Sequence, residues 1–155
     1  MKKPILVTFV LGTRPEAIKL APVIIKFKSD KSIVTRVILT GQHIEMVEQV
    51  MKLFNIKEDL NLEIMKDKQS LTHITNNVLS KIQKDLKSNR PNLLIIQGDT
   101  TSAFAAALGG FYEQIPIGHV EAGLRSNDKN MPEEINRILT DSISDYFFVT
   151  EISGV

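Results

Sequence analysis

The sequence predicts an α/β fold in which helices cover both faces of a parallel β-sheet. Short apolar runs alternate with longer stretches of helical periodicity along the whole chain, a pattern typical of βαβ units. The run at residues 93–96 is continuous and apolar, as expected of a central strand covered on both faces. Acidic residues follow such runs, and open parallel sheets bind ligands outside the carboxyl ends of their strands. We therefore expect the functional site at that edge.

The length and composition fit one globular domain. A chain of 155 residues can bury roughly 70% of the surface of its unfolded state. The absence of cysteine excludes disulfides and thiolate catalysis. The apolar start at residues 5–11 leads into a charged helix without a small-residue cleavage site, and no apolar run approaches the ~20 residues of a membrane span. We therefore predict a cytoplasmic protein without a membrane partner.

Charge is unevenly distributed along the chain. Residues 1–90 contain 16 Lys and Arg against 9 Asp and Glu, whereas residues 91–155 contain 3 against 9. The basic residues are scattered along predicted helices and aromatic residues make up only 6% of the chain, which argues against a nucleic-acid partner. Solvated helix faces explain most of the asymmetry. It also suits a site that binds an anion on one side and transfers protons on the other.

The first βα unit begins with a predicted strand at residues 4–10. After Gly12, a helix opens with Thr13 and Glu16 at a capping-box spacing and with Pro15 in the first turn, where its missing N–H costs nothing. We expect this helix to end near residue 29. Its predicted apolar residues are Ile18, Ala21, Pro22, Ile25 and Phe27.

The next units complete the first half of the chain. The β-branched run at residues 33–39 predicts a strand, and a turn at residues 40–43 leads into a helix that ends near residue 54. A short strand is predicted at residues 60–65. Residues 70–88 have the periodicity of a long amphipathic helix, closed by an Asn-Arg-Pro sequence.

The same alternation continues in the second half. The strand at residues 93–96 precedes a helix of small residues at 103–112, whose alanines and glycines allow close packing on the sheet. Residues 115–120 form the next predicted strand, and residues 146–149 the last one. A helix between these strands begins at Pro132, and its predicted core positions are Ile135, Leu139 and Ile143.

Three carboxylates stand where predicted strands end or helices begin. Asp99 follows the strand at residues 93–96, and the alternative to catalysis is that it caps the next helix, which is worth about 1 kcal/mol. Glu121 follows the next strand, where a functional role is favoured because glutamate is seldom buried without a partner. Glu133 lies four residues before Arg137, so these two could instead form an exposed pair. Carboxylates gathered at one edge would suit proton abstraction and return.

Cations and histidines supply the remaining candidates. The turn at residues 12–16 with Lys19 nearby indicates an anion site, because a helix N-terminus presents free N–H groups and partial positive charge. A plain capped helix is the alternative, since the glycine spacing matches neither the P-loop nor the dinucleotide fingerprint. His43 and His119 lack a recognised metal-ligand spacing. Hydrogen-bonded histidines are therefore favoured, and no metal is predicted.

Six motifs occur in order along the chain: GTRPEAIKLAPVI, TGQH, QGDTTSAFAAALGGFY, IPIGHVEAGLRS, MPEEINR and LTDSISDYFFVTE. Through them the whole chain resembles the N-terminal half of the non-hydrolysing UDP-N-acetylglucosamine 2-epimerases. The resemblance implies a Rossmann-like three-layer parallel sheet, similar to the N-terminal domain of a GT-B-type two-domain protein. It also implies that residues 1–155 are the N-terminal catalytic half, that the UDP-binding domain is absent from this chain, and that the chain alone is inactive.

The activity implied by the resemblance is interconversion of UDP-N-acetylglucosamine and UDP-N-acetylmannosamine, which supplies precursors of surface polysaccharide. In this family, removal of the proton at carbon 2 and expulsion of UDP give a 2-acetamidoglucal. UDP then adds back with the opposite configuration at carbon 2. The resemblance implies no metal or redox cofactor, and it implies a homodimer.

Matched motif by motif, the resemblance assigns roles to individual residues. The acidic catalytic residues are Asp99, Glu121 and Glu133. The cations expected to bind the substrate are Arg14, Lys19 and Arg137. Positions that contact an allosteric UDP-N-acetylglucosamine in bacterial members are matched by Gln42 and His43.

One departure from the family leaves alternatives open. The loop between Arg125 and Pro132 is slightly shorter than in the best-known bacterial epimerases and lacks their aromatic residue before the proline. Relatives that act on other UDP-2-acetamido sugars also have a short loop, so an epimerase for a related sugar is one alternative. A non-catalytic module that binds an anion or a nucleotide sugar is another, and a glycosyltransferase-type donor domain is a third.

Overall fold

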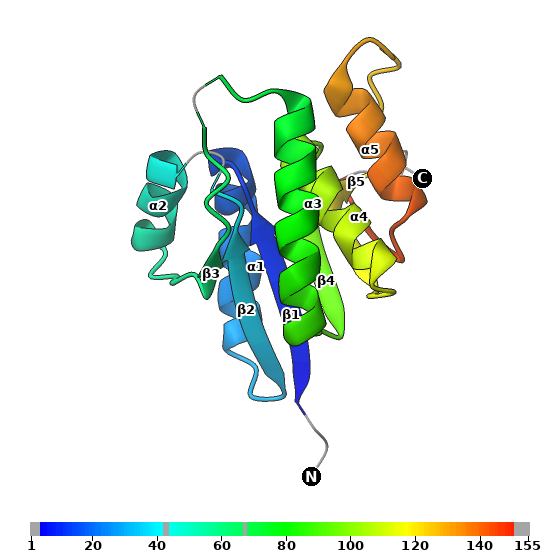
Figure 1. The fold of residues 1–155 in the computed structure, drawn as a ribbon. Helices are drawn as coiled ribbons and strands as arrows, with labels where there is room; N and C mark the ends of the chain where they lie inside the picture. The colour runs from blue at the N-terminus through cyan, green and yellow to red at the C-terminus, as the bar shows by residue number, and fades with distance from the viewer. Residues whose placement is uncertain (1–3, 42–43, 67, 151–155) are drawn as a thin grey trace.

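The computed structural model describes residues 4–41, 44–66 and 68–150, which form a parallel sheet with helices on both faces (Figure 1). The strands are β1 (Ile5–Leu11), β2 (Ile33–Leu39), β3 (Leu60–Asn61), β4 (Leu93–Gln97), β5 (Ile117–Ala122) and β6 (Tyr146–Val149). The helices are α1 (Arg14–Lys28), α2 (Ile44–Leu53), α3 (Leu71–Ser88), α4 (Thr101–Tyr112) and α5 (Pro132–Ser142). The predicted α/β fold with a three-layer parallel sheet is therefore confirmed.

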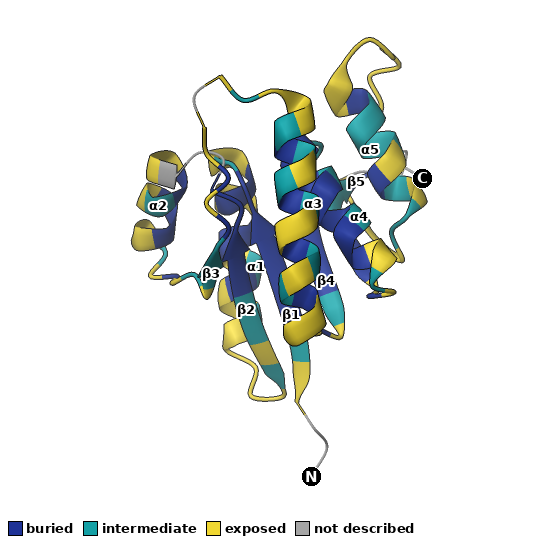
Figure 2. Cartoon of the chain, viewed as in Figure 1, coloured by how far each residue is buried: buried dark blue, intermediate teal, exposed yellow. Residues whose placement is uncertain are grey.

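The two faces of the sheet have separate cores. Successive side chains of a strand point to opposite faces, so Phe9 packs with α1 and α2, whereas Val10 packs with α3 and α4. In β4 the same alternation places Ile95 in one core and Ile96 in the other. Figure 2 shows these strands as a buried layer, with exposed residues on the outer sides of the helices. Burial on both faces explains the continuous apolar strands of the sequence.

Strand order locates the functional edge. The order is β3-β2-β1-β4-β5-β6, and every neighbouring pair is parallel. From β1 the chain adds β2 and β3 on one side. It then crosses to β4 on the other side of β1 and continues outward through β5 and β6. The loops that leave β1 and β4 therefore diverge to opposite faces, which opens a crevice between them.

Helix α4 packs closely on the sheet and on α3 because many of its residues are small. A side chain on Gly110 would lie 2.7 Å from Leu94 Cδ2 of the sheet, and one on Gly109 would meet Ile82 of α3. Six of the twelve residues of α4 are alanine or glycine, and all six are buried. The predicted close approach to the sheet is confirmed, and it extends to α3.

Two strands differ by two or more residues from the bounds that the sequence predicted. The fifth strand begins at Ile117, not residue 115, because Pro116 has no N–H and the N–H of Ile115 donates to Gly110 O at the end of α4. This strand continues past Val120 to Ala122 through a register shift. The third strand is limited to Leu60–Asn61 instead of residues 60–65.

Two helix faces were predicted correctly only in part: Ala21 is buried and Ile143 packs against the core, as expected. In α1 the buried apolar residues are Ala17, Leu20, Ala21 and Ile24, whereas Ile18 and Ile25 are exposed. In α5, Leu139 is exposed, because the helix packs on α4 through a face that includes Thr140.

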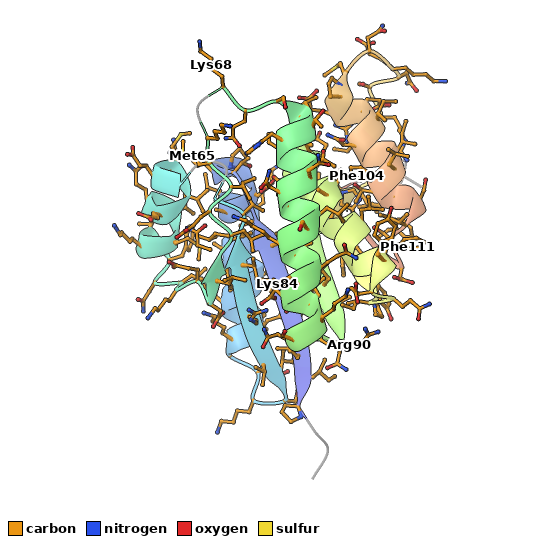
Figure 3. All side chains as sticks on the ribbon, viewed as in Figure 1. Met65, Lys68, Lys84, Arg90, Phe104 and Phe111 are labelled. Atoms are coloured by element: carbon orange, nitrogen blue, oxygen red, sulfur yellow. The ribbon has the colours of Figure 1, made fainter. Side chains whose placement is uncertain are left out.

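The basic side chains labelled in Figure 3, Lys68, Lys84 and Arg90, lie apart from one another and form no stripe.

Candidate active site

A pocket of about 330 Å³ lies at the carboxyl ends of β1, β4 and β5. It is lined by Thr13, Pro15, Glu16, Lys19, Gln97, Gly98, Asp99, Thr100, Glu121, Leu124 and Arg137. These residues come from the β1–α1 turn, the β4–α4 turn, the end of β5 and α5. The pocket is therefore at the switch point of the sheet, where an open α/β fold binds its ligand.

Glu121 enters this pocket from a bulge in β5. The register between β5 and β6 shifts between Val120 and Ala122, and Glu121 has a φ of 68°. A non-glycine residue is uncommon in this left-handed conformation, and such residues cluster at functional sites. The Oε2 atom of Glu121 accepts hydrogen bonds from Lys19 Nζ at 2.6 Å and from the side-chain amide of Gln97. Within the described part of the chain, Glu121 Oε1 has no hydrogen-bond partner.

Asp99 is held in a similar way on the other side of the pocket. Its Oδ2 atom accepts from the Arg137 guanidinium, and its backbone carbonyl accepts from Asn136 Nδ2 at 3.0 Å. The cap of α4 is Thr100, whose hydroxyl oxygen accepts from the N–H of Ala103 at 3.1 Å. Capping therefore does not occupy Asp99, and its carboxylate belongs to the pocket.

The N-terminus of α1 already holds a carboxylate. Glu16, only 2% exposed, accepts from Gly12 N at 2.5 Å and Thr13 N at 2.9 Å through Oε2, and from the Thr100 hydroxyl at 2.6 Å through Oε1. Burial raises the pKa of Glu16, and these hydrogen bonds oppose that shift. The predicted capping box is present. Glu16 therefore occupies the N–H groups that an external anion would use at this turn. The cations that line the pocket are Lys19 and Arg137.

The structure does not bring all predicted site residues together. Glu133 and Arg14 are exposed and do not line the pocket. The buried glutamate of α5 is Glu134, whose Oε2 lies 2.5 Å from Arg137 Nη1. The exposed pair of Glu133 with Arg137 is thus not formed. Gln42 and His43 lie outside the described residues.

Glu134 is a site residue that the sequence did not reveal. It accepts from the backbone N–H groups of Ser126 and Asn127, each at 3.0 Å. These bonds, the one from Ser126 first, lower the pKa of Glu134, and the charge of Arg137 adds to the shift. Glu134 therefore connects the loop before α5 to Arg137, and Arg137 to Asp99. The only sequence signal was its three-residue spacing to Arg137, which adjacent Glu133 obscures.

His119 is a buried hydrogen-bonded histidine, as its sequence context favoured. Its Nδ1 lies 2.7 Å from Asp141 Oδ1, and its Nε2 lies 2.7 Å from the carbonyl oxygen of Gly98. Within residues 4–41, 44–66 and 68–150, no cluster of three or more His, Asp or Glu is arranged to hold a metal ion. In the same residues, no helix is long and apolar enough to cross a bilayer.

The chemistry available in the pocket is acid–base chemistry next to positive charge. Glu121 and Asp99 each use one oxygen to pair with a cation, Lys19 or Arg137. The other oxygen of each carboxylate has no partner among the described residues, so it is available to a substrate. An arrangement of this kind can accept or return a proton while the cations stabilise a departing anion.

Comparison with known proteins gives a consistent family. The family model described as UDP-N-acetylglucosamine 2-epimerase matches residues 25–153. The UDP-N-acetylglucosamine 2-epimerase of Neisseria meningitidis is 48% identical over 141 residues, which are 90% of this chain and 38% of that protein. The enzyme of the same name from Bacillus subtilis is 45% identical over 94% of this chain and 39% of its own length.

Solved structures agree with the sequence comparisons. The Neisseria meningitidis enzyme bound to UDP-GlcNAc superposes with a TM-score of 0.94 at 45% identity, covering 97% of this chain and 41% of that one. The Methanocaldococcus jannaschii enzyme in complex with UDP-GlcNAc and UDP gives 0.92 at 38% identity, over 97% and 41%. A glycosyltransferase of kitacinnamycin, at 10% identity and a TM-score of 0.56, shares the fold alone. The chain thus spans about two fifths of the length of the relatives it matches, and it belongs to the UDP-N-acetylglucosamine 2-epimerase family.

Proposed function

We propose that this chain provides the acid–base wall of an enzyme that interconverts UDP-N-acetylglucosamine and UDP-N-acetylmannosamine. The observation that carries the proposal is the pair of carboxylates at the switch point, Glu121 and Asp99, each joined to a cation through a single oxygen. Membership of the epimerase family supports the choice of substrate. Epimerisation at carbon 2 requires loss of a proton from one face and its return to the other, so it needs an acid and a base.

The proposed reaction proceeds by elimination and re-addition. A carboxylate takes the carbon 2 proton, the electron pair of that C–H bond forms the double bond between carbons 1 and 2, and the bond from carbon 1 to the UDP oxygen breaks. UDP leaves with the electron pair of the bond that joined it to carbon 1, and the other product is 2-acetamidoglucal. In the return step UDP adds to carbon 1 and a protonated carboxyl group delivers a proton to the opposite face of carbon 2.

The residue roles follow from the pocket. We propose that Glu121 and Asp99 exchange protons with the sugar, and that Glu133 joins them when substrate is bound. Lys19 and Arg137 would stabilise the negative charge of the departing UDP, because cations aimed at developing charge lower the barrier. Arg14, which does not line the pocket, is proposed to contact the phosphates of the substrate. Gln42 and His43 are proposed to contact an allosteric nucleotide sugar.

The wider setting is also proposed from family membership. We propose that residues 1–155 form the N-terminal Rossmann-like domain, that a UDP-binding domain completes the site, and that the 155-residue chain alone has little or no activity. A homodimer, a cytoplasmic location and a role in supplying polysaccharide precursors are parts of the same proposal.

Deuterium incorporation tests this function. A protein of the relatives' full length that carries this chain is incubated with UDP-N-acetylglucosamine in heavy water, and carbon 2 is followed by NMR and mass spectrometry. We expect deuterium at carbon 2 and UDP-N-acetylmannosamine as product. Glu121→Gln should slow the exchange by at least 100-fold, while Glu58→Gln, distant from the pocket, should leave it unchanged.

The outcomes separate the alternatives. Deuterium at carbon 2 at the normal rate in Glu121→Gln would overturn the role of Glu121. Binding of UDP-N-acetylglucosamine without any exchange would indicate a binding module, and transfer of the sugar to an acceptor would indicate a glycosyltransferase. Exchange with a different UDP-2-acetamido sugar would correct the substrate.

A further inference from the structure

His119 and Asp141 form a buried hydrogen-bonded pair beneath the pocket. The side chain of His119 is fully buried and that of Asp141 is 10% exposed. His119 lies in β5, two residues before Glu121, and its side chain points to the face covered by α5, where Asp141 is located. Neither residue lines the pocket. Both therefore need a role other than direct contact with substrate.

Each ring nitrogen of His119 has a hydrogen-bond partner. A backbone carbonyl can only accept, so Nε2 donates its hydrogen to Gly98 O at 2.7 Å. On the other side, Asp141 Oδ2 receives the Gly123 N–H at 3.2 Å and lies 2.7 Å from Arg125 Nη2. Asp141 Oδ1 lies 2.7 Å from Nδ1 of the ring. The ring of His119 is thus held between the Gly98 carbonyl and the Asp141 carboxyl group.

This pair joins the two turns that carry the pocket carboxylates. Gly98 directly precedes Asp99, and Gly123 is two residues beyond Glu121. Both glycines have positive φ values, 78° and 82°, so each turn depends on a conformation that ordinary residues rarely adopt. On the side of the sheet covered by α5, contacts run from Gly98 through His119 and Asp141 to Gly123 and so connect the two turns. They add to the bond that the Gly98 N–H donates to Val120 O.

We propose that His119 and Asp141 are positioning residues that set the separation of Asp99 and Glu121. The inference rests on the proposed epimerisation. Proton transfer at carbon 2 requires both carboxylates at fixed positions relative to one sugar ring, and a misplacement of about 1 Å costs roughly 100-fold in rate. A buried, fully paired network restricts such movement more than exposed contacts do.

The kinetic test uses a protein of the relatives' full length that carries this chain. Asp141→Asn removes the carboxylate that pairs with the ring and with Gly123, and His119→Gln replaces a ring with polar atoms on opposite sides by a single amide. We expect kcat to fall by about 100-fold in both, with KM changed by less than a few-fold, because the substrate-contacting groups remain. Asp145→Asn is the matched control. Asp145 Oδ2 also accepts a backbone N–H, that of Ile117 at 2.8 Å, but at the opposite end of β5.

A spectroscopic readout separates positioning from stability. In NMR spectra of the 155-residue chain, Asp141→Asn should shift the amide signals of Asp99 and Gly123. Asp145→Asn should lower Tm without shifting these signals. If the full-length wild-type protein does not epimerise, the proposed function fails. If it does epimerise while Asp141→Asn and His119→Gln retain kcat, or if Asp141→Asn leaves the amide signals of Asp99 and Gly123 in place, the positioning role is wrong.

Discussion

The carboxylate of Glu121 lies 2.6 Å from the ammonium group of Lys19, in a contact between residues 102 positions apart in the chain. Lys19 belongs to α1, which follows β1, whereas Glu121 is on the bulge of β5. Strand β4 lies between β1 and β5 in the sheet. The ion pair therefore spans the crevice of the switch point, and it links the basic first half of the chain to the acidic second half.

Replacing Lys19 by methionine should reduce activity far more than stability. Lys19 is 47% exposed and Glu121 is 24% exposed, and exposed ion pairs contribute at most about 1 kcal/mol. Loss of a cation that stabilises departing UDP should lower kcat by roughly 100-fold. Urea denaturation and deuterium exchange at carbon 2 measure the two effects. Lys28→Met, at the far end of α1, is the control. Equal losses of activity in the two variants would show that the pocket does not use Lys19.

Glu133 and Glu134 should respond differently to the same change. Glu134→Gln removes the charge that holds Arg137 and the two N–H groups before α5, so Tm should fall by several degrees. Glu133→Gln should leave Tm unchanged because the side chain is exposed. If Glu133 acts on bound substrate, as proposed, its variant should nevertheless lose activity. Thermal unfolding and exchange at carbon 2, measured on both variants, test this contrast. A Tm that falls equally in both would contradict it.

The acid stability of the protein should also depend on Glu134. The pKa of Glu134 is lower in the folded state than the ordinary value of 4.5. Between the lowered pKa and 4.5, the unfolded chain binds more protons at this residue than the folded protein does. The free energy of unfolding therefore falls as the pH decreases through that window. Above pH 4.5 the contribution is fully present. Glu134→Gln should flatten this part of the curve of stability against pH, and an unchanged slope would remove the assigned cause.

Glu16 should have the opposite dependence on pH. Burial raises its pKa above 4.5 in the folded state, so between 4.5 and that raised value the folded protein binds more protons than the unfolded chain. The free energy of unfolding therefore falls as the pH increases through this window. Relative to wild type, Glu16→Gln should be least stable at low pH and should gain relative stability as the pH increases above 4.5. Urea denaturation at several pH values measures the difference, with exposed Glu45→Gln as the control. A difference that does not vary with pH would contradict the assignment.

The sequence predicted the strands and the edge of the sheet because burial on two faces leaves apolar runs that local patterns reveal. It could not locate the bulge at Glu121, since a register shift depends on how two strands pair. It predicted the capping box of Glu16, but it could not reveal that the Thr100 hydroxyl, 84 residues away, donates to the other oxygen of Glu16.

The apolar face of α1 was assigned incorrectly for a different reason. Two sets of apolar residues with helical spacing interleave in this helix, and both satisfy the period of 3.6 residues. The buried set contains Leu20 and Ile24, and the exposed set contains Ile18, at 46%, and Ile25, at 44%. Only the position of the sheet decides between them. Glu133 and Glu134 present the same ambiguity, because neighbouring residues on a helix point about 100° apart.

Gly109→Ala should destabilise the fold even though alanine is the better helix former. The exchange gains at most about 1 kcal/mol in helix propensity. A methyl group at this position would, however, overlap Ile82 Cγ2, and Ile82 is fully buried in the core between α3 and α4. Forcing extra volume into a packed core costs about 1–3 kcal/mol, so the steric term should exceed the gain.

The cost of Gly109→Ala should be smaller when Ile82 is also replaced by alanine, because the added methyl group then occupies part of the space that is vacated. The two changes should therefore be less than additive. Urea denaturation of both single variants and of the double variant measures this coupling. Simple additivity, or a Gly109→Ala variant more stable than wild type, would show that α4 has room to move away from α3.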